Sequence, residues 1–521
     1  MRMILPFEFR CFKCVTALLV MGSVLSCQRQ QPPPLYKFDT GVADIVVTKP
    51  PKLYDVSLAT ATENRILHSP SDQPGDHFGA SIAITLTTLV VGAPNTTGGG
   101  AAWVFDLADA NAAPIKLIAP YLSSRGACGA SVAISDSGRF IAVGAPNSTV
   151  QNIPNVGVVH VWEKKDGQWT YEAAYAREDL LENSMLGKTV AINDETLLAG
   201  APFATRLIPI KIPSKMDPDV YTIEYKNIPA HGVIATWMRV NNEWIEDALL
   251  SPDNFIDNAE FGAAMSLKGV QLIVGAPCAR ASEQIQAGKS YIFIRRISGW
   301  PQSPVTDIAQ TGSRIFKDDS NTISGNGPYN HFGWAVNILG TIALAGTPGD
   351  SHGNLQNCGS INIYQRITER TWIPSQYIHA ADGSDYDAFG SAVGIAQTQF
   401  VIGAPMKSEN DLEKVGAVYI YQFIQNSDPF VDEFVVKLLP LQPVAQARFG
   451  SVLACTSDII AISAPGTTYY SNQGKIYIFN RSEISWGVPG PTITTTTIQP
   501  PSANSTTESD VAPSQGEIAA P

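Results

Sequence analysis

Short apolar runs separated by turn residues extend along most of this chain. The runs are rich in β-branched and aromatic residues, and several alternate in polarity, as in Val418–Tyr421 and Lys475–Phe479. Alternation with a period of two, bounded by Gly, Asn and Asp, is typical of β-strands. No long stretch shows the period of an amphipathic helix. The pattern therefore predicts an all-β protein.

A dipeptide and a tripeptide recur in a fixed order through these runs. Phe-Gly begins one run, and Gly-Ala-Pro ends the next. Clean copies begin at Phe78, Phe261 and Phe389, and four copies altered in one residue begin at Cys128, Leu186, Phe332 and Phe449. The seven copies are 50 to 75 residues apart. Repeats of this kind are typical of propellers and solenoids.

Each unit contains four apolar runs. A third run follows a further glycine, as at Gly416–Tyr421, and a weaker fourth precedes the next Phe-Gly, as at Val435–Leu438. Seven units of four strands match a sheet repeated around an axis, which leaves only short edges. The predicted fold is a seven-bladed β-propeller of four-stranded antiparallel blades over residues 54–486. We expect the repeated glycines to lie where neighbouring blades converge and no side chain fits.

These repeats resemble the FG-GAP repeats that form the seven-bladed propeller of integrin α chains and of many bacterial surface proteins. The resemblance covers residues 54–486. It implies that the loops after Gly-Ala-Pro and the loops before Phe-Gly share one rim, which is the face used for ligands.

Integrin-type repeats carry an Asp-rich calcium loop in the turn between the two motif strands. Here these turns are short, as in Thr85–Thr88 and Lys268-Gly269, and none offers the set of about six oxygens that calcium takes. They resemble the short hairpins of bacterial FG-GAP proteins. We therefore expect no calcium in the hairpins and no other cofactor.

The two ends of the sequence differ from the repeats. Residues 1–26 are predicted to be a signal peptide, because basic residues precede the apolar run Val15–Leu25. Cys27 resembles the lipidated cysteine of a bacterial lipobox, although an ordinary signal peptidase could cut at the same place. Residues 27–53 are predicted to be a polar, Pro-rich tether, and 487–521 a disordered Thr-, Pro- and Ser-rich tail. We expect an exported protein, either secreted or anchored as a membrane lipoprotein at the cell surface or in the periplasm.

Charge and cysteine usage narrow the possible functions. The net charge is −12 and only 16% of the residues are charged, which argues against a nucleic-acid partner. The repeats contain four of the seven cysteines, at positions that match no zinc motif: Cys128, Cys278, Cys358 and Cys455. A disulfide between Cys278 and Cys358, which lie near loops of adjacent units, is one alternative to free thiols.

The long loops carry the candidate binding residues. Residues 203–231 form the longest connection after a Gly-Ala-Pro, and residues 312–331 form a second long excursion on the same rim. Loops on a rigid scaffold often carry function. The first of them contains apolar residues that are candidate ligand contacts: Ile208, Ile210, Ile212, Tyr221 and Tyr225.

Acidic loop residues are weaker candidates, for metal ligands. Three of them, Asp382, Asp385 and Asp387, cluster before Phe389. The others are Asp318, Asp319, Glu409, Asp411 and Glu413. Acidic loop residues are usually solvated, and we predict no bound metal.

Two functions are consistent with the sequence. No Gly-x-Ser-x-Gly, His-Glu-x-x-His or phosphate-binding loop is present, so we expect a protein that is not an enzyme. The first hypothesis is an integrin-α-like, surface-anchored adhesion module that binds a protein or glycan on its loop rim. The alternative is an extracytoplasmic propeller hydrolase or lyase that acts on a polysaccharide through carboxylates such as Asp382, Asp385 and Asp387.

Overall fold

The computed structural model describes most of the repeat region. The described residues are 63–71, 74–120, 122–213, 221–252, 257–280, 284–301, 304, 306–309, 329–368, 371–423, 431–466 and 474–481. Their regular structure consists of strands in seven four-stranded antiparallel sheets and one two-stranded sheet, with no helix in these ranges. The predicted all-β class is confirmed. The predicted signal peptide, tether and tail, together with Cys27, Asp318 and Asp319, lie outside the described residues.

Each four-stranded sheet is one blade, and six blades use strands in chain order. Blade 1 contains β2 (Ser81–Ile84), β3 (Thr88–Ala93), β4 (Ala101–Asp106) and β5 (Ile115–Leu117). Blade 2 contains β6 (Ser131–Ile134), β7 (Phe140–Ala145), β8 (Val158–Lys165) and β9 (Gln168–Tyr175). Blade 3 contains β10 (Thr189–Ile192), β11 (Thr196–Ala201), β14 (Val233–Val240) and β15 (Glu243–Leu250).

The remaining blades follow the same plan. Blade 4 contains β16 (Ala264–Lys268), β17 (Gln271–Ala276), β18 (Lys289–Ile294) and β19 (Thr306–Ala309). Blade 5 contains β20 (Val336–Leu339), β21 (Ile342–Thr347), β22 (Ser360–Arg366) and β23 (Trp372–Ile378). Blade 6 contains β24 (Ala392–Ala396), β25 (Gln399–Ala404), β26 (Ala417–Phe423) and β27 (Val431–Leu438). Blade 7 contains β28 (Val452–Cys455), β29 (Ile459–Ala464), β30 (Lys475–Asn480) and β1 (Arg65–His68).

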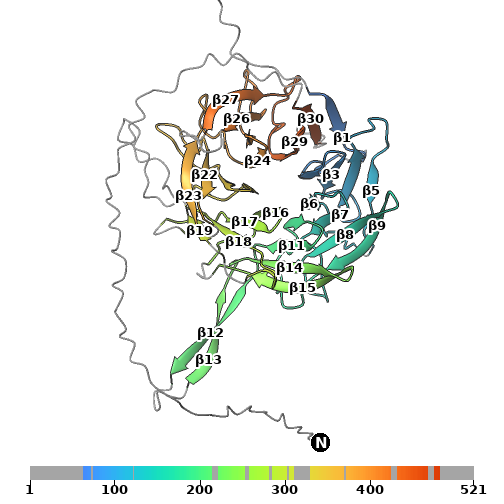
Figure 1. Ribbon diagram of the computed structural model, residues 1–521, viewed down its shortest axis with the longest axis vertical. Coiled ribbons are helices and arrows are strands. Elements are labelled where there is room, and N and C mark those ends of the chain that lie inside the picture. The colour runs from blue at the N-terminus through green and yellow to red at the C-terminus, as the bar shows by residue number, and fades with distance from the viewer. Residues whose placement is uncertain are drawn as a thin grey trace, which may run out of the picture. The chain divides into compact units, whose positions relative to one another are not determined.

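The blades form a closed ring. The first strand of each blade contacts the first strands of both neighbours, and the circle closes where β28 meets β2 (Figure 1). The predicted seven-bladed propeller of four-stranded antiparallel blades is therefore confirmed.

The ring is closed by a strand from the beginning of the repeat region. β1 pairs antiparallel with β30 and becomes the outermost strand of blade 7, with Leu67 opposite Ile476. One blade is thus built from both ends of the described chain. The repeat pattern does not identify this strand, because it lies before the first Phe-Gly.

The predicted role of the repeated glycines is confirmed at the junctions between blades. A Cβ on Gly275, in β17, would lie 1.9 Å from the carbonyl oxygen of Gly333 in the next blade. The backbones approach so closely that only glycine fits without a shift. The same close approach recurs at five further junctions: Gly92–Gly129, Gly144–Gly187, Gly200–Gly262, Gly346–Gly390 and Gly403–Gly450.

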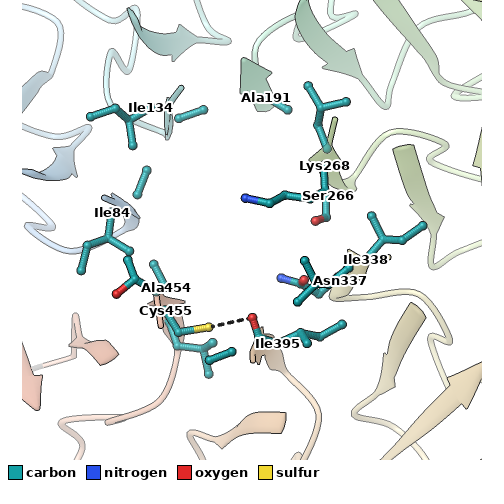
Figure 2. A pocket seen from close by; sticks show the side chains of 18 of the residues that line it. Ile84, Ile134, Ala191, Ser266, Lys268, Asn337, Ile338, Ile395, Ala454 and Cys455 are labelled. Atoms are coloured by element: carbon teal, nitrogen blue, oxygen red, sulfur yellow. Dashed lines mark hydrogen bonds between the residues drawn. The ribbon is translucent and has the colours of Figure 1, made fainter. Parts of the chain in front are cut away.

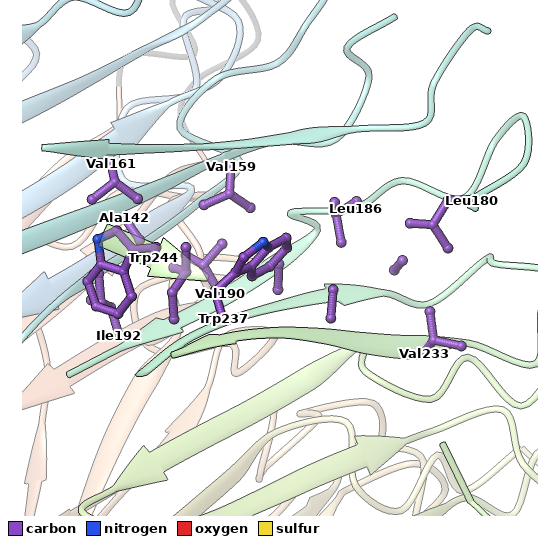
Figure 3. Packing of buried hydrophobic residues seen from close by; sticks show 14 of the residues in the cluster. Ala142, Val159, Val161, Leu180, Leu186, Val190, Ile192, Val233, Trp237 and Trp244 are labelled. Atoms are coloured by element: carbon purple, nitrogen blue, oxygen red, sulfur yellow. The ribbon is translucent and has the colours of Figure 1, made fainter. Parts of the chain in front are cut away.

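Apolar side chains fill the space between adjacent blades. Figure 3 shows the cluster between blades 2 and 3, where Val159 and Val161 of β8 lie opposite Val190 and Ile192 of β10, and Trp237 of β14 completes the layer. Leu186, which replaces the Phe of a Phe-Gly, belongs to the same cluster. The repeated aromatic position is therefore an inter-blade core residue.

The seventh junction contains serine in place of the second glycine. Ser463 donates a hydrogen bond from Oγ to the carbonyl oxygen of Gly79, 2.6 Å away and buried, across the closure of the ring. Ser463→Ala keeps the Cβ and removes only this bond, so it should cost about 1 kcal/mol of stability in urea unfolding. Ser451→Ala in the same blade, whose hydroxyl bonds exposed backbone of its own turn, should cost much less. Equal losses would mean that the inter-blade bond contributes nothing specific.

Candidate functional site

The loops of the repeats gather on one side of the ring. We call this side the loop face; it comprises the connections between second and third strands and those that lead into each Phe-Gly. The two sets bond to each other across blade boundaries: Phe389 N–H donates to the carbonyl of Cys358 at 2.9 Å, and Tyr386 N–H to that of Gln356 at 2.8 Å. The inference that these loops share one rim is confirmed.

The insertion at residues 203–231 is a β-hairpin rather than an irregular loop. Strands β12 (Arg206–Pro213) and β13 (Tyr221–Ile228) form their own two-stranded sheet, and Figure 1 shows it standing out from the ring. Alternation of isoleucine at 208, 210 and 212 was a strand signal in the sequence.

The register of the hairpin separates the five candidate contact residues. Ile208 is opposite Lys226, Ile210 is opposite Glu224 and Ile212 is opposite Thr222. Because directly opposed residues share a face of a ribbon, positions 208, 210 and 212 lie on one face and positions 221 and 225 on the other. The five candidates therefore form two sets of positions rather than one patch.

The base of the hairpin is attached to the ring. Ile228, the last residue of β13, is buried. Beyond it, the carbonyls of Pro229 and Ala230 accept hydrogen bonds from Asn258 N–H at 2.9 Å and Glu260 N–H at 3.0 Å, which belong to the loop leading into blade 4. The hairpin thus starts from a fixed point on the loop face between blades 3 and 4.

The acidic cluster before Phe389 is bound by two buried lysines. Lys407 Nζ donates to Asp387 Oδ2 at 2.9 Å, and both side chains are at most 5% exposed. Lys437 Nζ donates to Asp382 Oδ2 at 2.7 Å. Tyr419 Oη donates to the other oxygen of Asp382 at 2.8 Å. The carboxylates that the sequence offered as metal ligands therefore accept hydrogen bonds from ammonium and hydroxyl groups.

Burial and ion pairing act in opposite directions on these carboxyl groups. Burial raises the pKa of Asp387 above its usual value, although Lys407 opposes the shift. Burial also disfavours ionised Asp382, but Lys437 and Lys407 together hold the pKa of this more exposed carboxyl below its usual value. The arrangement is that of a structural ion-pair network at the junction of blades 5 and 6.

The remaining acidic candidates are separate from one another. Asp385 Oδ1 accepts a hydrogen bond from Gln356 N–H at 2.8 Å, Glu409 pairs with Lys437, and Glu413 Oε2 accepts from Gln446 Nε2 at 3.3 Å. Asp411 is exposed in its loop. Within the described ranges, no group of three or more His, Cys, Asp or Glu side chains is arranged to hold a metal ion.

Exposed aromatic side chains on the loop face were not predicted. Tyr329 is 55% exposed and Tyr386 is 57% exposed, and each lies three residues before the Phe of a Phe-Gly. Trp334, directly after Phe332-Gly333, is 50% exposed and packs edge-on against His331. The spacing from Phe-Gly was a signal for the two tyrosines, because a repeated position has a repeated place in the fold. Exposed aromatic residues are common anchors of binding surfaces.

A cavity of about 400 Å³ lies on the ring axis, lined by the first strands of all seven blades (Figure 2). Its lining includes Lys268, Gln397 and Ser457, which adjoin the turns between first and second strands; we call that side of the ring the turn face. Most other lining side chains are aliphatic. No Asp, Glu or His is among the described residues that line it, so the lining offers no carboxylate or imidazole for acid–base catalysis.

The four cysteines of the repeats are thiols. Cys278 and Cys358 are both free, so the disulfide considered as an alternative is not formed. Cys358 is buried, and its thiol lies 3.7 Å from the carbonyl oxygen of Asp350 within its own blade. The bridge is absent because Cys358 is directed into its own loop.

Comparison with known families agrees with this geometry. A family model described as the FG-GAP repeat matches residues 62–105 and 372–421. Each matched segment contains a clean Phe-Gly and Gly-Ala-Pro pair. No curated protein matches the chain. The described residues contain no helix that could cross a membrane.

Proposed function

We propose that this chain, which is an FG-GAP repeat β-propeller, is a non-catalytic binding or adhesion module whose loop face holds a protein or glycan ligand. The observation that carries the proposal is the hairpin β12–β13. It extends from a base that two backbone hydrogen bonds fix to the loop face, and no other described connection contains such a sheet. A rigid ring that carries one long β-hairpin is suited to binding a large ligand.

Further features of the ring support binding rather than catalysis. Tyr329, Trp334 and Tyr386 present exposed aromatic surface on the same face as the hairpin. The carboxylates of Asp382 and Asp387, which the sequence offered as acid–base groups for a hydrolase or lyase, are paired with Lys437 and Lys407. We further propose that the module is exported and held at a membrane through Cys27, as its sequence context predicts.

Removal of the hairpin tests the proposal. Arg206 and Ile228 are cross-strand partners, so an Asn-Gly turn can replace residues 207–227 without moving the ends. We expect the variant to keep its thermal unfolding midpoint and to lose at least about tenfold in affinity for cultured-cell surfaces or for ligands on a printed glycan array, the loss of one hot-spot contact or more. A folded variant that binds as the parent chain does would exclude the hairpin as the grip.

Two double substitutions then distinguish the faces of the hairpin. Ile208→Ser with Ile210→Ser changes one face, and Tyr221→Ser with Tyr225→Ser changes the other. We expect one pair to reproduce most of the effect of the deletion and the other to serve as its control. Release of reducing ends when the intact chain is incubated with polysaccharides would contradict the non-catalytic assignment.

A further inference from the structure

We propose that the axial cavity near the turn face is a binding site for a small amphipathic carboxylate, of the size of a medium-chain fatty acid. The site is separate from the loop face and does not depend on the function proposed for it. The volume of about 400 Å³ is in the range of small-molecule sites. The proposal depends on how polar and apolar groups are distributed around the wall.

Three hydrogen-bond donors lie on adjoining strands at one side of the cavity, while the other polar lining residues, Gln397, Thr456 and Ser457, lie at the turns of blades 6 and 7. Ser266 and Lys268 lie two positions apart on β16, so both point to the same face of this strand, and Asn337 lies on the adjoining β20. Figure 2 shows these three side chains directed into the cavity. Lys268 is the only charged residue among the described residues that line it. An ammonium, a hydroxyl and an amide are together the donors that a carboxylate accepts from.

Away from the turn residues Thr456 and Ser457, the opposite side of the cavity is apolar. Ile84 of β2 and Ala454 and Cys455 of β28 face Ser266 and Asn337 across the axis, and Ile134 of β6 extends this apolar wall (Figure 2). The Cys455 thiol is turned to the carbonyl oxygen of Ile395, 3.5 Å away, and leaves its methylene on the wall. A ligand with a charged head and a short alkyl chain matches this division, because the chain loses contact with water while the head keeps its hydrogen bonds.

The charged group at the cavity is available to a ligand. Lys268 Nζ pairs with Asp136 Oδ1 of blade 2 at 2.7 Å, and the two side chains are 45% and 71% exposed. Ion pairs as exposed as this one contribute little to stability, and an ammonium group can donate three hydrogen bonds. Lys268 can therefore bond a carboxylate while Asp136 competes for it. The exposure of the pair also places an opening of the cavity at the turn face.

Titration of the full chain with octanoate, followed by calorimetry, tests the site. We expect saturable binding of one octanoate per chain, with 1-octanol bound at least about tenfold more weakly because it lacks the charge. Lys268→Met should weaken octanoate binding about tenfold, and Asn337→Leu, which keeps the side-chain size, about threefold. Lys188→Met is the matched control, since Lys188 is exposed and does not line the cavity.

Removal of the competing carboxylate should have the opposite effect. Asp136→Asn leaves Lys268 without its ion-pair partner, so octanoate should bind about two- to threefold more tightly, the worth of an exposed ion pair. Three results would overturn the proposal: no saturable octanoate binding, equal binding of 1-octanol, or a folded Lys268→Met variant with the affinity of the parent chain. None of them would bear on the role of the loop face.

Discussion

Replacing Gly275 with alanine should destabilise the propeller by about 3 kcal/mol or more, because the new methyl group would collide with backbone. The Cβ would lie 1.9 Å from the carbonyl oxygen of Gly333 and 3.2 Å from the Cβ of Ala264. A carbonyl at a blade junction cannot turn aside as a flexible side chain can, so blades 4 and 5 must separate. The loss would appear as a lower midpoint in urea unfolding followed by tryptophan fluorescence.

A second glycine of the same blade provides the control. Gly269, in the turn between β16 and β17, has a φ of +58° and nothing within 4 Å of its Cβ position. Asparagine tolerates this left-handed conformation, so Gly269→Asn should change stability by well under about 1 kcal/mol. If both variants unfolded at the same urea concentration as the parent chain, close approach at the junction would not explain the repeated glycine.

The repeat motif was sufficient to predict the fold because each of its residues has a defined structural role at a blade junction. Phe389 is fully buried and its N–H bonds the preceding blade, while Gly390 meets Gly346 where no side chain fits. The close glycine contact recurs at six of the seven junctions, so the same residues recur at the same place in each unit. The number of blades and the strands within each could therefore be predicted.

The sequence does not reveal a backbone feature that is equally regular. The residue before the Phe position has a positive φ in all seven units, although none is glycine: His77, Ala127, Met185, Glu260, His331, Ala388 and Arg448. Alanine, methionine and arginine do not favour this conformation. The tertiary bonds of the loop face impose it, and composition carries no sign of it.

The candidate site was only partly predictable, for two different reasons. Pro209 and Pro213 interrupt the apolar alternation of β12, and proline argues against a strand unless it lies at an edge. The hairpin is a ribbon of two edge strands, which is the exception.

The acidic cluster was misleading because Lys407 and Lys437 lie 20 and 55 residues beyond the carboxylates they bind. Neither partner is local, so sequence spacing could not show that the charges are paired.

Replacing Lys407 with methionine should be the most damaging change in this network. It removes the ammonium group from a nearly inaccessible pair and leaves Asp387 buried without a cation within hydrogen-bond distance. Removing one partner of a buried ion pair typically costs about 3–5 kcal/mol. We expect a loss of this size at pH 7 in urea unfolding. Lys414→Met, on an exposed position of the same loop, should have almost no effect.

The dependence on pH and on a second substitution identifies the cause of this loss. Burial already raises the folded-state pKa of Asp387, and without Lys407 it should rise further. A carboxyl group whose pKa is raised in the folded state destabilises the protein least at low pH, where it is protonated. The destabilisation grows as the pH rises through the folded-state pKa. The loss in Lys407→Met should therefore be smaller at pH 5 than at pH 7. Asp382, whose pKa is lowered, should stay ionised and paired with Lys437 at both pH values.

Adding Asp387→Asn to Lys407→Met should recover much of the lost stability, because no charge is then left buried. A double variant whose loss equals the sum of the losses of the two single variants would show that the pair is not coupled.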